Sequence, residues 1–489
     1  MRSVSRGAGA AEIPFAEMDI DSPPADSPQV AEPTVPYPRR FWWLTRLSVT
    51  GCAIVILGLG VRWWWGEVAQ RRIDTAIAAA RDRGEPILVS DYAPESHPPD
   101  EVNAAVYLRR AAMALKFSRT EEWALQNADG LPLRPDIAQV AAETVRKYRP
   151  QLAGIVEARR HPNTIDWALA IRSPMWNVLL RDLNHLAELR MLANAAALLA
   201  AQQGDYGEAL EQFRNMRFCA DAAQSQPFLV AQQSVMHGHR WALSTVADIV
   251  VDMPLEDAKL REQLRAMIAV LLDERRQTEA LQDGMRGDRA MHLDTGMMLS
   301  ASYPVLRPAL HLDTLRLLEQ DDAMIAASNA PTWPATKAAF PVRPTFAGSK
   351  HHARFVGNLF TNAWDEKNLL RHAQLKAHGR LVATMLAIRL YQHDHPGQRP
   401  PTLEALVPQY LSTVPRDPLA ATDQPIRYLP QGARPYIYSL GENGVDDTAT
   451  GWRPRAADLV PTAAADAFVD LVRHSIKRPV TTRPAAEGP

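Results

Sequence analysis

Residues 177–223 read NVLLRDLNHLAELRMLANAAALLAAQQGDYGEALEQFRNMRFCADAA. Apolar residues recur every three or four positions on both sides of the turn at residues 204–206, which is the spacing of two amphipathic helices. Short turns between long helices indicate antiparallel neighbours. The stretch therefore predicts a helical hairpin, and similar periodicity over residues 100–330 predicts an irregular antiparallel helical domain around it.

The hairpin resembles a single tetratricopeptide-type unit. The matching residues are the turn at residues 204–206 and the register of Ala209, Leu210 and Phe213. A regular array of such repeats needs about three or more stacked units, and one is recognisable in the sequence. The resemblance implies a surface that binds partner proteins, whereas plain helix packing explains the same pattern without any binding role.

An apolar stretch near the start of the chain predicts a membrane-spanning helix over residues 41–65. Residues 47–61 carry no charge, and tryptophans flank them at both ends: Trp42, Trp43, Trp63, Trp64 and Trp65. Tryptophan belts mark the two interfaces of a bilayer, and the length between them matches the roughly 20 residues that a span requires. A buried core helix is the alternative.

Arginines are balanced on the two sides of this segment, so the positive-inside rule does not orient it. The short first segment and the long following region favour a single-pass protein of a bacterial inner membrane whose C-terminal region lies in the periplasm. Residues 1–38 are rich in proline and acids, which predicts disorder.

The sequence divides into seven predicted segments. They are a disordered tail (1–38), a transmembrane helix (41–65), a stalk and linker (66–99), the helical domain (100–330), a connector (331–354), a long helix with a small head (355–460) and a C-terminal tail (461–489).

Charge and cysteine usage exclude several classes of function. The chain of 489 residues has a formal net charge of −1, so no electrostatic argument favours nucleic acid as a partner. Its two cysteines, Cys52 and Cys219, fall in the apolar segment and in a predicted helix, so we expect neither an internal disulfide nor a cysteine-based metal cluster.

The C-terminal region changes from helical to mixed patterning. A helix is predicted to end before Pro396, a short helix follows at residues 403–407, and alternating residues at 426–429 and 436–439 predict two strands of a hairpin. A small sheet needs a covering helix, and the preceding long helix can supply one. We therefore expect a small α+β head.

Residues 381–447 resemble the globular head of the major pseudopilin of type II secretion. The resemblance rests on a helix ending at Tyr391, the short helix at 403–407, the turn at 415–418 and the strand residues 436–439. A pseudopilin has its membrane helix directly before the head, whereas here the span lies roughly 300 residues earlier. We therefore expect a borrowed module and no assembly into a pilus.

In the pseudopilin family the loop after the last strand binds calcium. The resemblance places Leu440, Asn443, Asp446 and Asp447 in that loop, where their oxygens could hold a hard cation. An unoccupied turn is the alternative. No other cofactor is expected.

One charged stretch could carry acid–base chemistry. Glu279 and Asp283 are four residues apart and would share one helix face with Arg286. Two carboxylates on one face can act as acid and base if they are buried, but such a run is more often a solvated, ion-paired face.

These patterns favour a mainly α protein with one transmembrane helix, an irregular antiparallel helical domain and a small C-terminal α+β head. The expected function is that of a non-enzymatic, membrane-anchored envelope protein that acts through contacts with other proteins. The alternatives are a carboxylate-dependent envelope hydrolase and an accessory component of a type II secretion-like system.

Overall fold

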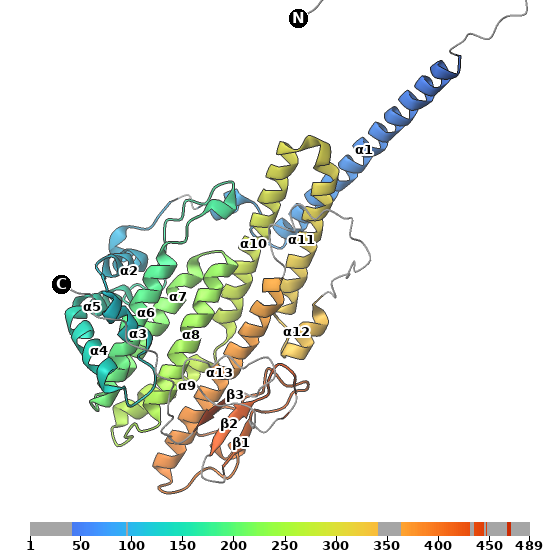
Figure 1. Ribbon diagram of the computed structural model, residues 1–489. Coiled ribbons are helices and arrows are strands. Elements are labelled where there is room, and N and C mark those ends of the chain that lie inside the picture. The colour runs from blue at the N-terminus through green and yellow to red at the C-terminus, as the bar shows by residue number, and fades with distance from the viewer. Residues whose placement is uncertain are drawn as a thin grey trace, which may run out of the picture. The chain divides into compact units, whose positions relative to one another are not determined.

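The computed structural model describes residues 42–93, 96–340, 363–430, 435–444, 446 and 467–470. The predicted disordered tail, much of the predicted connector and Asp447 lie outside these residues. Within them the chain is mainly helical, as expected (Figure 1).

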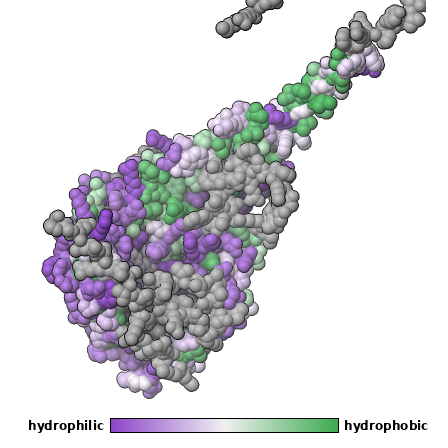
Figure 2. Space-filling model, viewed as in Figure 1, coloured by the Kyte–Doolittle hydropathy of each residue, from purple (hydrophilic) through white to green (hydrophobic). Residues whose placement is uncertain are grey.

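Helix α1 (Trp42–Asp82) contains the predicted membrane span and continues beyond it without a break. Its first part is long and apolar enough to cross a membrane, and none of its most apolar window is buried. The compact unit formed by residues 62–489 begins at Arg62, directly after that apolar part. Figure 2 shows hydrophobic residues along the exposed part of α1.

The remaining helices form the body of the protein. Their bounds are α2 Ala104–Met113, α3 Arg119–Gln126, α4 Pro135–Lys147, α5 Arg149–Ala158, α6 Asp182–Gln202, α7 Tyr206–Asp221, α8 Leu229–Val250, α9 Ala258–Leu272, α10 Arg275–Ser302, α11 Arg307–Ala327, α12 Trp333–Ala339 and α13 Ala363–Asp394. Short 3-10 turns lie at Val89–Tyr92, Asp100–Val102, Met175–Asn177, Ala222–Ser225, Pro304–Leu306 and Leu403–Leu406.

Helix α6 lies at the centre of the core. From Leu192 to Ala201 every residue is buried, because α2, α4, α7 and α8 all pack against it. Small alanines on several faces suit a helix enclosed on all sides. One continuous apolar core runs from Ala104 to Ile437, so the predicted helical domain and the C-terminal head share it.

The part of α1 predicted as a stalk packs against the body. Ile73 and Ala80 are buried in a cluster with Leu293 of α10 and Leu315 of α11.

A buried arginine fastens the loop that follows α1. Arg289 of α10 is 1% exposed; its guanidinium donates to the Glu85 carboxylate at 2.9 Å, to Asp322 and to the Pro86 carbonyl at 3.4 Å. A buried cation needs such partners to offset its desolvation. These contacts hold the residues after α1 against α10 and α11.

Helix α10 also packs very closely against a neighbouring loop. A Cβ added at Gly287 would lie 1.6 Å from the carbonyl oxygen of Pro227. No side chain fits at that distance, so the close approach of these backbones requires glycine at position 287.

One predicted helix boundary was wrong. The helix expected from Asn177 starts at Asp182, because residues 178–180 are loop-like. Helices α9 and α10 are separated at Asp273, whose backbone is extended and whose carboxylate accepts a hydrogen bond from the Arg275 amide at 3.3 Å.

The head consists of α13 and a small antiparallel sheet in the order β1-β2-β3. Its strands are β1 Arg427–Leu429, β2 Tyr436–Ser439 and β3 Ala467–Asp470, and α13 packs on β2 and β3. Tyr428 pairs with Ile437, which in turn pairs with Val469. The predicted hairpin is confirmed, but β3 falls in the segment expected to be a tail.

A buried carboxylate holds this head together. Asp417 is fully buried and accepts hydrogen bonds from the Ser439 hydroxyl at 2.6 Å and from the backbone amides of Leu440 and Leu419 at 2.9 and 3.0 Å. Arg427 of β1 approaches the same carboxylate at 3.4 Å. Burial raises the pKa of Asp417, against the effect of these bonds.

Candidate functional site

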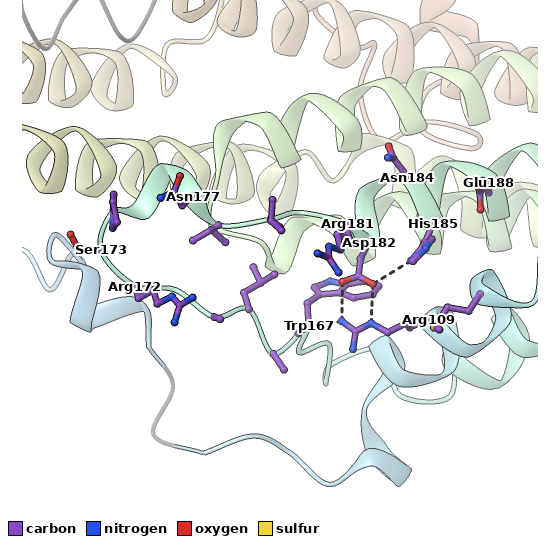
Figure 3. Close-up of a pocket in the computed structure, with 17 residues that line it drawn as sticks. Arg109, Trp167, Arg172, Ser173, Asn177, Arg181, Asp182, Asn184, His185 and Glu188 are labelled. Atoms are coloured by element: carbon purple, nitrogen blue, oxygen red, sulfur yellow. Dashed lines mark hydrogen bonds and ion pairs between the residues drawn. The ribbon is translucent and has the colours of Figure 1, made fainter.

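A groove of about 1040 Å³ lies between α2, the start of α6 and the loop that connects α5 to α6 (Figure 3). The loop contributes most of the lining, from Trp167 to Leu179. Arg109 and Met113 come from α2, and residues 182–188 come from α6. Three separate segments therefore build the walls.

The loop follows this groove without forming a strand: Ala168 has a left-handed backbone, and the amide of Ile171 donates to the carbonyl of Leu169 at 2.9 Å, which makes a tight turn around Ala170. We call residues 167–173 the edge segment. Trp167 is buried, and Leu169 and Ile171 are partly buried, whereas Ala168, Ala170 and Arg172 between them are exposed. Alternation with a period of two is typical of a β-strand with one face on a core.

The edge segment has open backbone hydrogen-bonding groups. The amides of Ala170, Arg172 and Ser173 donate to no residue that the structure describes. An extended chain with free backbone donors and acceptors is the template to which another strand can add. The edge segment therefore offers three unpartnered backbone donors to a polypeptide ligand, on either side of the turn around Ala170.

The second residue of the edge segment has an unfavourable backbone conformation. Ala168 has φ of +49°, in the left-handed region that residues with a Cβ rarely adopt. Its amide donates to Oδ1 of Asp166 at 2.8 Å, which helps to hold the turn. Strained residues of this kind occur preferentially at binding sites.

An ion pair forms the floor of the groove at one end. Arg109 donates to both oxygens of Asp182, with Nε–Oδ1 and Nη2–Oδ2 distances of 2.9 and 2.8 Å, and to the Trp167 carbonyl at 2.9 Å. Its guanidinium carbon lies 5.6 Å from the centre of the Trp167 ring. A bidentate pair of this kind is rigid, so it fixes α2, the edge segment and α6 relative to one another.

The Arg109–Asp182 pair also occupies the Asp182 carboxylate, which could otherwise act in catalysis. Nδ1 of His185 lies 3.6 Å from Oδ1 of Asp182, beyond hydrogen-bond distance. The hydroxyl in the lining, Ser173, lies at the opposite end of the lining from His185 (Figure 3). The lining residues thus contain no nucleophile in reach of a base.

The rim of the groove carries apolar and cationic side chains. Met113 and Leu179 are 65% and 64% exposed. Arg172 and Arg181 are exposed and form no ion pair with the described part of the chain. Partial burial raises the pKa of Glu188. The rim therefore suits a ligand with both apolar and acidic groups.

The carboxylates predicted for acid–base work lie elsewhere and face solvent. The side chains of Glu279 and Asp283 are 57% and 62% exposed, and each lies beside an arginine, Arg275 at 3.8 Å and Arg286 at 2.7 Å. This is the solvated, ion-paired face that the sequence allowed as the alternative.

The predicted calcium loop is only partly described. Leu440 and Asn443 lie in it, and Asp446 accepts hydrogen bonds from Arg427 at 2.8 Å and from Tyr438 at 3.1 Å. Among described residues no group of three His, Cys, Asp or Glu side chains could hold a metal. A cation there would have to compete with Arg427 for Asp446, and calcium binding stays a prediction.

The predicted interface tryptophans lie on α1. Trp42 and Trp43 near its start are 52% and 55% exposed, and Trp63, Trp64 and Trp65 are 73%, 63% and 46% exposed. They lie at both ends of the exposed apolar part, and their role at a membrane interface stays a prediction.

The groove was missed from the sequence, although a signal was present. Residues 165–171 alternate between large apolar and other residues, which is a strand pattern. The helical periodicity of the neighbouring hairpin is a stronger pattern than this alternation. In addition, Asp182, the ion-pair partner of Arg109, lies 73 positions away in the chain, so no local pattern joins the two.

Comparison with protein-family models, with curated proteins and with solved structures finds no match to this chain.

Proposed function

We propose that this chain is a membrane-anchored protein that works by binding another polypeptide, and that the groove receives an extended segment of that partner. The observation that carries the proposal is the edge segment, whose exposed amides at Ala170, Arg172 and Ser173 have no protein partner among the described residues. A peptide that adds as a strand would satisfy them.

The side chains around the edge segment support the same ligand. The three unpartnered amides fall within residues 170–173, so about four residues of a bound segment would lie against them. Met113 and Leu179 offer apolar contact at the rim, and Arg172 and Arg181 offer positive charge. We therefore expect the bound segment to combine apolar and acidic residues.

The rigidity of the site favours binding. The Arg109–Asp182 pair fixes the floor before any ligand arrives. A preformed site avoids part of the ordering cost that weakens peptide binding.

Peptide selection on the full-length protein in lipid nanodiscs tests this proposal. A degenerate library of extended peptides should yield sequences that bind saturably. Leu179→Asp should weaken their binding by about tenfold or more, which is 1.4 kcal/mol. Val270→Asp is the matched control, since Val270 is 49% exposed on α9. Failure to enrich any sequence, or equal loss in both variants, would overturn the groove assignment.

The same peptides test the charge of the rim. Arg172→Glu and Arg181→Glu should weaken the binding of acidic peptides, and raising the salt concentration should weaken the wild-type interaction. A salt-independent affinity would remove the electrostatic part of the proposal.

We further propose that residues 66–489 lie outside the cytoplasm of a bacterial cell and that the C-terminal head is related to pseudopilin heads. The order of α13, the turn at Leu403–Leu406, β1 and β2 supports the second point. Alkaline phosphatase, which is active only outside the cytoplasm, should be active when it is fused after Pro489. If instead only a reporter that requires the cytoplasm is active at that position, the proposed location is wrong.

A further inference from the structure

The turn between α10 and α11 exposes a cluster of apolar residues. We call residues 303–306 the α10–α11 turn. Tyr303 is 56% exposed, Val305 is 75% exposed and Leu306 is 36% exposed. Large apolar side chains gathered at a turn are costly to leave in water. Something apolar should cover them.

Hydrogen bonds hold this turn beside Arg62, the first residue of the compact body. The guanidinium of Arg62 donates to the carbonyl oxygen of Val305, with an Nε–O distance of 3.2 Å, and to that of Pro304. Arg62 directly follows Val61, the last residue of the uncharged apolar stretch. An arginine at this position marks the membrane–water boundary.

Further contacts run along the next turns of α1. Arg307 donates to the Gln70 side chain at 3.3 Å, and Pro308 lies against Gly66, where an added Cβ would be 3.5 Å from its ring. Helix α1 and the start of α11 thus lie side by side from Arg62 onward (Figure 1). The α10–α11 turn is therefore held beside the first residues of α1 that follow the apolar stretch.

We propose that the α10–α11 turn is a second membrane-contacting element, which inserts Tyr303, Val305 and Leu306 into the interfacial layer of the bilayer that α1 crosses. The chemistry fits that layer. A tyrosine prefers the headgroup level, and aliphatic side chains bury into the acyl boundary. Trp63, Trp64 and Trp65 lie on the neighbouring turn of α1.

Two contacts with one bilayer orient a protein in a way that a single helix does not. The residues after Arg62 are fixed to the body at both ends, by the α10–α11 turn and by the Glu85–Arg289 pair. A turn embedded in the interface would therefore hold the whole body at a defined angle to the membrane.

Depth-dependent fluorescence quenching of the full-length protein tests this inference, which rests on the proposed membrane span. An environment-sensitive dye is attached to one cysteine at a time: native Cys52 in a Cys219→Ser background, and Val305→Cys or Val270→Cys in a Cys52→Ser, Cys219→Ser background. The protein is reconstituted in phosphatidylcholine–phosphatidylglycerol vesicles that carry nitroxides on the headgroup or deep in the acyl chain.

The dye at position 305 should be quenched about twofold or more by headgroup nitroxides, and its emission should be blue-shifted relative to position 270. The dye at Cys52 should be quenched by the deep nitroxides. If position 305 behaves like position 270 while Cys52 is quenched, the turn does not contact the membrane and the span stands. If Cys52 is not quenched, the span itself is wrong and this inference fails with it.

Discussion

Two buried histidines should make the stability of this protein fall between pH 7 and pH 5. His372 and His378 lie on α13 and are 4% and 7% exposed. Burial and the nearby Lys376 lower the pKa of His372 from 6.5 to about 3, and burial and Arg240 lower the pKa of His378 to about 3. The folded protein therefore keeps both rings neutral where the unfolded chain protonates them.

The sign and size of the effect follow from that difference. Because the folded-state pKa is depressed, the stabilising contribution is present above pH 6.5 and is lost as the pH falls toward 3. Between pH 7 and pH 5 each ring costs about 2 kcal/mol of unfolding free energy, so the pair costs about 4 kcal/mol. That is a large part of the roughly 5–15 kcal/mol of a typical domain. Carboxylates with lowered pKa values, such as Glu85 and Glu211, act below this window.

Urea unfolding of the detergent-solubilised full-length protein, followed by far-UV circular dichroism, measures the slope. The double variant His372→Gln, His378→Leu should reduce the loss of unfolding free energy between pH 7 and pH 5 by about 4 kcal/mol. Burial also lowers the pKa values of His237 and His311, and their share of the slope should remain. His393→Gln, at the end of the same helix, should keep the wild-type slope. A double variant with the wild-type slope would refute the assignment of the pH dependence to these two rings.

Three further changes test particular contacts by the same unfolding assay. Arg289→Met should lower the unfolding free energy by about 3 kcal/mol, because it leaves the Glu85 carboxylate buried with fewer partners. The control is Arg275→Met, at a side chain that is 78% exposed, which should change the unfolding free energy by less than about 0.5 kcal/mol. Asp417→Ala should cost about 2–4 kcal/mol and speed amide exchange in the sheet, and unchanged exchange would refute its role in the head. Gly287→Ala should cost more than about 2 kcal/mol, since its Cβ would meet a backbone carbonyl.

Local patterns in the sequence were enough to predict several elements. Tryptophans at both ends of an uncharged stretch located the exposed apolar part of α1. Helical periodicity on both sides of Gly204 predicted the pair α6 and α7, and alternation predicted β2 at residues 436–439. Each of these signals is contained within about 25 neighbouring residues, which is the range over which periodicity can be recognised.

Features that depend on distant parts of the chain could not be predicted. Glu85 and Arg289 are 204 positions apart, and no local pattern pairs them. Strand β3 was missed because its partner, β2, precedes it by about 30 residues, and register between such strands is set by the packed face. The edge segment has a strand pattern but no strand beside it, so alternation alone could not identify a groove.

Amide hydrogen exchange of the edge segment, with and without a selected peptide at saturation, tests the central claim most directly. Strand addition predicts that exchange at Ala170, Arg172 and Ser173 slows by about tenfold or more when the peptide binds, because these amides gain partners. Peptide binding that leaves exchange in residues 168–173 unchanged would contradict the account.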